Sequence, residues 1–223
     1  MIPQRDSKIK AVTRTIQTRM AEFNQRYRSG PSLYFYRRIL SLRRSCPKID
    51  RFLSSDYHLE ILYAVLIAWD MDSRRARLKD FDDFKCSLLD CLDLLRTVEG
   101  TLDEFVPSRA DALLASLSSV FRKLSLMQTS ARLVSNSKCL HFLFPTVCMP
   151  MDGLNTLQYL YGNTGESVRR YEEITSFCCA IMAERVEFTR YLDDQWNQSV
   201  PKLVDNAIIL LNDKSVKHGT RSV

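Results

Sequence analysis

The stretch DFDDFKCSLLDCLDLLRTV, residues 80–98, decides the fold class of this chain. Its apolar side chains recur every three or four residues, which is the period of one face of an α-helix and not that of a strand. These side chains belong to Phe81, Phe84, Leu88, Leu92 and Leu95. We expect residues 80–98 to form one helix that Gly100 stops.

The helical period continues on both sides of this stretch. It predicts helices over residues 7–28, 32–45, 56–70, 109–127, 137–144, 153–162, 167–196 and 200–212. No segment alternates with period two for long enough to indicate a strand. We therefore predict an all-α fold, a compact multi-helix domain with one core or two small lobes. Residues 1–51 would form basic N-terminal helices, residues 52–213 the helical core, and residues 214–223 a flexible tail.

Positive charge is concentrated at the N-terminus. Residues 1–51 contain 13 Lys and Arg against 3 Asp and Glu, a net charge of +10, whereas the whole chain carries +6. A basic segment attached to a mildly acidic body is typical of polyanion binding, and nucleic acid is the commonest such partner. We expect DNA as the partner, with RNA as the second candidate. The alternative is a solvated basic helix surface without any partner.

Two arginine clusters are candidates for nucleic-acid contacts. The first is interleaved with Tyr34, Phe35 and Tyr36, a mixture that suits stacking on bases, although Tyr36 also fits a core position. The second, in the loop after Trp69, would contact phosphate or pair with neighbouring acids at helix ends. The two clusters are Arg37, Arg38, Arg43 and Arg44, and Arg74, Arg75 and Arg77.

The composition argues against several classes of protein. Seven cysteines without a disulfide-framework spacing indicate free thiols in a reducing compartment, which we expect to be the cytoplasm. His58, His141 and His218 are isolated, so we expect no metal and no other cofactor. The longest apolar stretch, Leu59–Trp69, is too short to span a bilayer, and the N-terminus does not resemble a secretory signal. We expect no membrane contact.

Residues 133–161, LVSNSKCLHFLFPTVCMPMDGLNTLQYLY, differ from the rest of the chain. We expect Val134–Ser137 to form a short loop before a helix that starts near Lys138, with Ser135, Asn136 and Ser137 as candidate nucleic-acid contacts. Backbone N–H groups at such a helix start can bind phosphate. Asp152 stands at the mouth of the next helix among apolar neighbours, which would raise its pKa by desolvation.

Each of these residues also has an ordinary structural interpretation. Asp152 would be a plain helix N-cap, and Lys138 a surface lysine beside an apolar helix. His141, between Leu140 and Phe142, fits a hydrogen-bonded core or pocket-edge histidine better than a catalytic base.

The segment Ser137-Lys-Cys-Leu-His-Phe-Leu-Phe-Pro145, followed by Pro150-Met-Asp152, resembles a pattern in uncharacterised prokaryotic helical proteins. That pattern has a Ser-Lys-x-Leu-His element, a proline a few residues later, and Pro-x-Asp. Ala68-Trp-Asp-Met71 with Arg74–Leu78, and Pro201–Ile208, are similar to further marks of the same group. The resemblance covers most of the chain and implies no particular activity.

More distantly, the stretch from Lys138 to Asp152 resembles the helix-hairpin-helix DNA glycosylases. The resemblance implies that Lys138 is a nucleophile, that Asp152 is the general catalytic carboxylate, and that a flipped base enters a pocket near His141 and Trp69. Val134–Ser137 stands where the family has a Gly-x-Gly hairpin, and the iron–sulfur cysteines of some members are absent. Two classes of function remain: a glycosylase-like DNA-binding protein, with or without catalysis, or a non-catalytic helical interaction protein whose basic surface contacts RNA, DNA or an acidic partner. They differ in whether Lys138 and Asp152 face one common groove.

Overall fold

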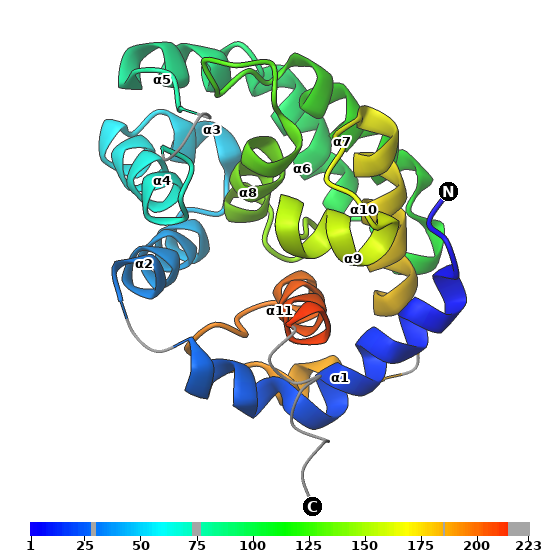
Figure 1. Ribbon diagram of the computed structural model, residues 1–223. Coiled ribbons are helices and arrows are strands. Elements are labelled where there is room, and N and C mark those ends of the chain that lie inside the picture. Colours follow the sequence, from blue (N-terminus) through cyan, green and yellow to red (C-terminus); the bar gives the residue numbers. More distant parts are fainter. Residues whose placement is uncertain (28–29, 73–76, 185, 214–223) are drawn as a thin grey trace, which may run out of the picture.

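The computed structural model describes residues 1–27, 30–72, 77–184 and 186–213, and this part of the chain is all-α, as predicted (Figure 1). The β-type pairing in the described residues is limited to one isolated antiparallel bridge between Leu78 and Met127. The first helices are α1 (Arg5–Arg26), α2 (Pro31–Ser45), α3 (Ile49–Leu53), α4 (Asp56–Ala68), α5 (Phe81–Leu89), α6 (Leu92–Leu102) and α7 (Asp111–Lys123). The later ones are α8 (Leu133–Leu143), α9 (Gln158–Tyr161), α10 (Val168–Met182) and α11 (Val200–Asn212). Shorter turns are the 3₁₀ segments η1 (Pro107–Arg109) and η3 (Phe188–Tyr191) and the π-helical η2 (Gly153–Leu157).

Polar caps fix where several helices begin. The side chains of Ser55, Asp80, Ser167 and Ser199 each accept a hydrogen bond from a backbone N–H in the first turn of the helix that follows. Such caps satisfy donors that the helix itself leaves unpaired. The sequence signals for helix starts are therefore reliable at α4, α5, α10 and α11.

Helices α8 and α11 lie toward the middle of the ribbon, with the other helices around them (Figure 1). Nearly every residue of α8 and most residues of α11 are buried. Helix α1 packs on α11 and α10, while α2 packs on α4 and α8. One hydrophobic cluster runs from Ile2 to Leu210, so the basic N-terminal helices contribute to the same core as the rest of the chain.

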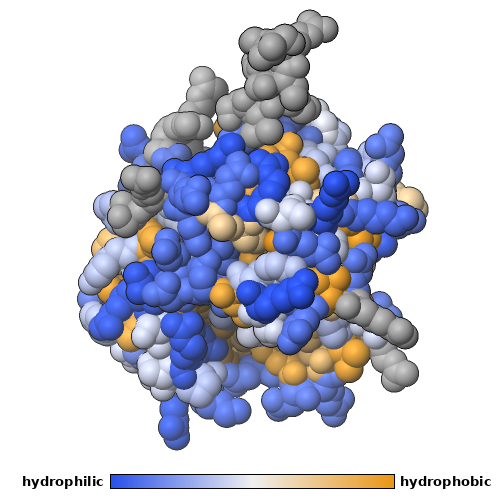
Figure 2. All heavy atoms as spheres, turned by 90° about the horizontal axis from the view of Figure 1, so that it is seen from below, coloured by the Kyte–Doolittle hydropathy of each residue, from blue (hydrophilic) through white to orange (hydrophobic). Residues whose placement is uncertain are grey.

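The surface seen from below Figure 1 is mainly hydrophilic, with apolar side chains showing between polar ones (Figure 2). Residues 214–223, predicted as a tail, lie outside the described residues. No helix in the described ranges combines the length and the apolar character needed to cross a membrane.

The helices predicted over residues 80–98 and 167–196 are divided or shortened in the structure, and the helix predicted over residues 153–162 is the π-helical η2 followed by α9. Residues 80–98 form α5 and α6 instead of one helix, because the chain turns at Asp90 and Cys91. Gly100 does not stop α6, which continues to Leu102; a helical glycine costs only about 1 kcal/mol relative to alanine.

The helix predicted over residues 167–196 ends at Met182. After the 3₁₀ turn η3, the Asp193 carboxylate accepts hydrogen bonds from the backbone N–H groups of Gln195 and Asn197. This local turn contains Trp196, so the segment that was predicted as the end of the helix is held in a non-helical form by side-chain to backbone hydrogen bonds.

Candidate functional site

A cavity of about 270 Å³ lies where the ends of α1 and α4 meet α8, η2 and α11; we call it the central cavity. Its apolar walls include the rings of Phe23, Tyr27, Trp69 and Trp196. Its charged lining residues are Asp70, Lys138, Asp152, Lys202 and Asp205. An apolar pocket with a few convergent polar groups is the usual form of a small-ligand site.

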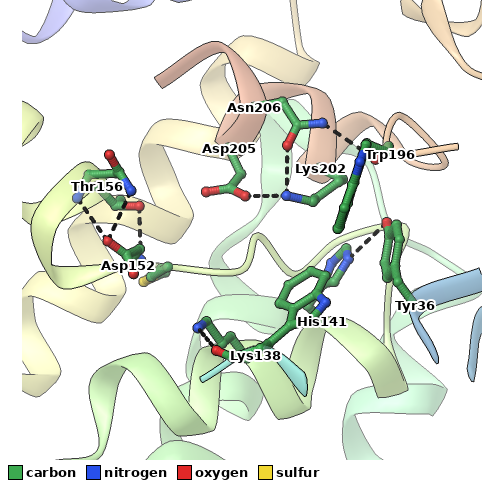
Figure 3. Close-up of polar contacts among 12 residues, drawn as sticks. Tyr36, Lys138, His141, Asp152, Thr156, Trp196, Lys202, Asp205 and Asn206 are labelled. Atoms are coloured by element: carbon green, nitrogen blue, oxygen red, sulfur yellow. Dashed lines mark hydrogen bonds and ion pairs between the residues drawn. The ribbon is translucent and has the colours of Figure 1, made fainter. Parts of the chain in front are cut away.

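Lys138, in the second turn of α8, enters the central cavity from one side (Figure 3). Its side chain donates a hydrogen bond of 2.8 Å from Nζ to the backbone carbonyl of Trp69, and Nζ lies 5.9 Å from the centroid of the Trp69 ring. The residue is only 8% exposed, and this burial lowers the pKa of its amine. Among the described residues, no carboxylate lies within 4.0 Å of Nζ.

Asp152 lines the same cavity and caps η2. Its Oδ1 accepts hydrogen bonds of 2.9 Å from the backbone N–H groups of Leu154 and Asn155, and one of 3.2 Å from the Asn155 side chain. The hydroxyl of Thr156 lies 3.0 Å from the Asp152 backbone nitrogen, which donates to it. The carboxylate is thus both a helix cap, as one interpretation of the sequence proposed, and a wall of the cavity. Single π-helical turns such as η2 are frequent at functional sites.

A second lysine–aspartate pair, which the sequence analysis did not single out, completes the charged lining. Lys202 and Asp205, one turn apart on α11, form an ion pair of 2.6 Å between Nζ and Oδ2. Lys202 also donates to Oδ1 of Asn206 at 2.7 Å. Lys202 is 3% exposed and Asp205 is 4% exposed. Burial raises the pKa of the Asp205 carboxyl, and the nearby Lys202 charge opposes that shift.

Aromatic rings surround the Lys202 ammonium. Nζ lies 5.1 Å from the Trp69 centroid, 5.7 Å from that of Phe23 and 5.8 Å from that of Trp196, distances within the range of cation–π attraction. The sequence contained a signal for this pair, because two charged residues interrupt the apolar run of residues 200–211. Charged side chains are rarely buried unless they are paired, so two charges on a buried helix indicate an ion pair.

Asp70 follows α4 at the edge of the cavity with a φ of 66°. This left-handed conformation is uncommon for residues other than glycine, but aspartate and asparagine adopt it more readily than most. The turn at Asp70 ends α4 at a point where the Trp69 carbonyl can accept the hydrogen bond from Lys138 Nζ.

His141 and Trp69 were both expected at a pocket, and the structure separates them. Trp69 lines the cavity, whereas His141 is fully buried and lies behind it, with the two ring centroids 6.4 Å apart. His141 Nδ1 is 2.7 Å from the Cys148 carbonyl, and Nε2 is 3.3 Å from the Tyr36 hydroxyl. Burial lowers the His141 pKa to about 3, so the ring is neutral and supports the wall of the cavity from inside the core. Tyr36, for which the sequence allowed a core position, is buried.

The expected loop at Ser135, Asn136 and Ser137 is wrong, because α8 already begins at Leu133. All three side chains are buried and hydrogen-bonded inside the protein; for example, Asn136 Nδ2 donates to the carbonyls of Phe121 and Leu124. The expected phosphate position at the helix start is also filled. Glu166 Oε2 accepts hydrogen bonds of 3.0 Å from the backbone N–H groups of Arg132 and Leu133.

Three of the four arginines predicted on the second helix line a groove of about 880 Å³, which we call the outer groove. They are Arg37, Arg38 and Arg44, and Tyr34 beside them is 65% exposed. The outer groove and the central cavity share two bordering segments, the start of α2 and residues 192–198. Acidic groups also border the groove: Asp194 lies 3.5 Å from the Arg37 guanidinium.

Arg43 does not take part in this surface. It is buried, and its guanidinium donates hydrogen bonds to the carbonyls of Cys46, Pro47 and Leu143. Arg43 therefore ties the end of α2 to α8. In the second cluster, Arg77 is exposed, while Arg74 and Arg75 lie outside the described residues.

In the described ranges, no three His, Cys, Asp or Glu side chains cluster in a way that could hold a metal ion. The chemically distinctive groups of the site are its buried lysines, Lys138 and Lys202, its aspartates, of which Asp205 is buried, and its aromatic walls. Comparison of the chain with protein-family models, curated proteins and solved structures finds no match.

Proposed function

We propose that this protein binds DNA and acts as an N-glycosylase on a base turned out of the duplex into the central cavity. The observation that carries the proposal is that Lys138 and Asp152, fourteen residues apart in the sequence, line one cavity with aromatic walls. A flat base would lie against these rings, because stacking on aromatic side chains is favourable for every base. The cytoplasm suits such a protein, since most of its cysteines are buried free thiols.

The chemistry follows from the two side chains. The Lys138 amine, with its lowered pKa, would attack the anomeric carbon of the sugar. The base would leave with the electron pair of the glycosidic bond and take up the proton lost from the attacking nitrogen. Asp152 would stabilise the positive charge that develops on the sugar. Opening of the sugar ring would then give an imine between Lys138 and the sugar.

The outer groove would hold the phosphate backbone beside the cavity. Arg37, Arg38 and Arg44 provide three cations there, and Tyr34 offers an exposed ring. Neutralising phosphates releases counterions, so binding supported by these residues should weaken as salt increases.

The test is incubation with duplexes that contain damaged bases, in the presence of borohydride, which reduces an imine to a stable covalent adduct. We expect an adduct with the native protein and none with Lys138→Gln. Lys85→Gln, which removes a lysine that pairs with Asp56 and does not line the central cavity, is the matched control and should keep the adduct.

The absence of both adduct and abasic product over a broad panel of lesions would overturn the enzymatic proposal. The outer groove would then belong to a non-catalytic protein with a basic contact surface. A competition between duplex DNA and RNA in the same assay decides which nucleic acid the groove prefers.

A further inference from the structure

The central cavity contains two lysines that are close in space and very different in their surroundings. Lys202 has an ion-pair partner in Asp205 and a second acceptor in Asn206. Lys138 has one hydrogen-bond partner in the described residues, the uncharged carbonyl of Trp69. Figure 3 shows the Lys202–Asp205 pair on one side of the cavity and Lys138 on the other.

Three carboxylates line the cavity with Lys138, and two of them, Asp152 and Asp205, are held by other donors. Asp205 gives one oxygen to Lys202, and Asp152 gives Oδ1 to three N–H donors at the start of η2. A carboxylate that paired directly with Lys138 would hold it as an ammonium, which cannot act as a nucleophile.

We propose that Lys202 is a positioning residue: it holds the Asp205 carboxylate in an ion pair and so keeps that carboxylate from pairing with Lys138. Lys138 is then the reactive amine of the central cavity, available to an aldehyde carbonyl. The reaction is condensation: the Lys138 nitrogen bonds to the carbonyl carbon, water leaves, and an imine forms. The proposal deepens the glycosylase function, because an abasic sugar in its open form is an aldehyde.

A chain of hydrogen bonds extends from Asn206, the second acceptor of Lys202, to Asn197 and Asp193. Asn206 Nδ2 donates to Asn197 Oδ1 at 2.8 Å and also reaches the Trp196 carbonyl. Asn197 is in turn held by Asp193, whose Oδ2 accepts from its side chain at 2.6 Å. These contacts fix Lys202 from the side away from Lys138. A buried ion pair is seldom a net source of stability, so a network of this kind suggests a role in the site.

The charges around Lys138 agree with this assignment. Burial is the main cause of its lowered pKa; the Lys202 charge lowers it further, whereas Asp152, Asp205 and Asp70 raise it. Tyr27, a further titratable group of the lining, is 39% exposed, and its partial desolvation raises its pKa, so the phenol stays neutral. Removing Lys202 or Asp205 should therefore move the Lys138 pKa in opposite directions.

The experiment measures labelling of Lys138 by formaldehyde and cyanoborohydride as a function of pH, with quantification by peptide mass spectrometry. Formaldehyde is small enough to enter the cavity, and exposed Lys10 in the same chain is the reference. We expect Lys138 to reach half-maximal labelling at a lower pH than Lys10. Lys202→Met should raise the Lys138 midpoint by about one pH unit, and Asp205→Asn should lower it by a similar amount.

The double variant Lys202→Met with Asp205→Asn removes the pair without leaving a buried unpaired charge, and its midpoint should return close to that of the native protein. If Lys202→Met fails to fold, the comparison of Asp205→Asn with the double variant still isolates the Lys202 charge, and the double variant should have the higher midpoint. Shifts in the same direction, no shift, or a Lys138 midpoint equal to that of Lys10 would overturn the proposal.

This test is independent of the glycosylase assay, since it uses no DNA. Borohydride adducts at Lys138 together with unshifted labelling profiles would refute the role of Lys202 and leave the proposed function intact. Shifted profiles without any base release from DNA would do the reverse.

Discussion

Lys138 and His141 lie on the same helix, and both have a lowered pKa because both are buried. Their surroundings nevertheless give them different roles. Lys138 reaches a cavity, whereas both nitrogens of His141 lie within hydrogen-bonding distance of groups in the core. The sequence interpretation of His141 as a core histidine is consistent with this placement.

His141 should make the protein sensitive to acid. The folded-state pKa of about 3 is below the ordinary value of 6.5, so the unfolded chain binds a proton that the folded chain does not. Stability is therefore lost as the pH falls from about 6.5 toward 3, and His141 should account for about 2 kcal/mol of the loss between pH 7 and pH 5. Urea denaturation at these two pH values should show a smaller loss for His141→Gln. Half-buried His58 provides the control, and a His58→Gln profile as flat as that of His141→Gln would contradict the assignment.

At the scale of the elements, the apolar period predicted helix positions well because burial of one face is the main force that stabilises a helix in a protein. It could not detect the turn between α5 and α6, since Leu88 and Leu95 are both buried on either side of it. It also missed that α10 ends at Met182 and that a separate polar turn forms at Asp193. In the site, Lys138 and Asp152 could be singled out from local motifs. The charges at Lys202 and Asp205 within an apolar run could have indicated a buried pair, but the position of Lys202 against Phe23 and Trp69, which are distant in the sequence, is contained in no local pattern.

The cap at η2 separates the structural role of Asp152 from its proposed chemical role. Asp152→Ala removes the acceptor for the N–H groups of Leu154 and Asn155 and should lower the free energy of unfolding by about 1 kcal/mol. Asp152→Asn keeps a capping oxygen and should retain nearly native stability, while base release is lost with the carboxylate charge. Thermal unfolding and the duplex assay measure the two effects. Equal activity in the native protein and Asp152→Asn would exclude a role for the charge.

At the scale of the whole molecule, the excess of positive charge at the N-terminus is divided between two uses. Arg43 is buried in the core, where its hydrogen bond to the Leu143 carbonyl joins α2 to α8, and Arg26 pairs with Glu22 and Asp213. Arg37, Arg38 and Arg44 remain on the wall of the outer groove. Composition alone showed the charge but could not show which arginines face solvent.

We expect replacement of Arg37, Arg38 and Arg44 by glutamine to weaken DNA binding and to reduce the slope of log affinity against log salt by about 3, since three phosphate contacts would be lost. Fluorescence anisotropy with a labelled duplex measures this slope. A salt range of about 50 to 200 mM is suitable, because affinity that depends on counterion release falls steeply over it. The matched control replaces Arg96, Arg122 and Arg169, which carry the same charge on α6, α7 and α10 outside the groove. A control that loses as much affinity as the groove variant would show that net charge alone, and not the groove, attracts DNA.

The walls of the central cavity have one practical consequence. The chain contains two tryptophans, and both of them, Trp69 and Trp196, line this cavity. The tryptophan fluorescence of the protein, excited selectively at wavelengths that tyrosine does not absorb, therefore originates at the site without any introduced label. A ligand that stacks between these indoles should quench that emission in proportion to occupancy, so a simple titration can rank free bases and nucleosides before any product is identified.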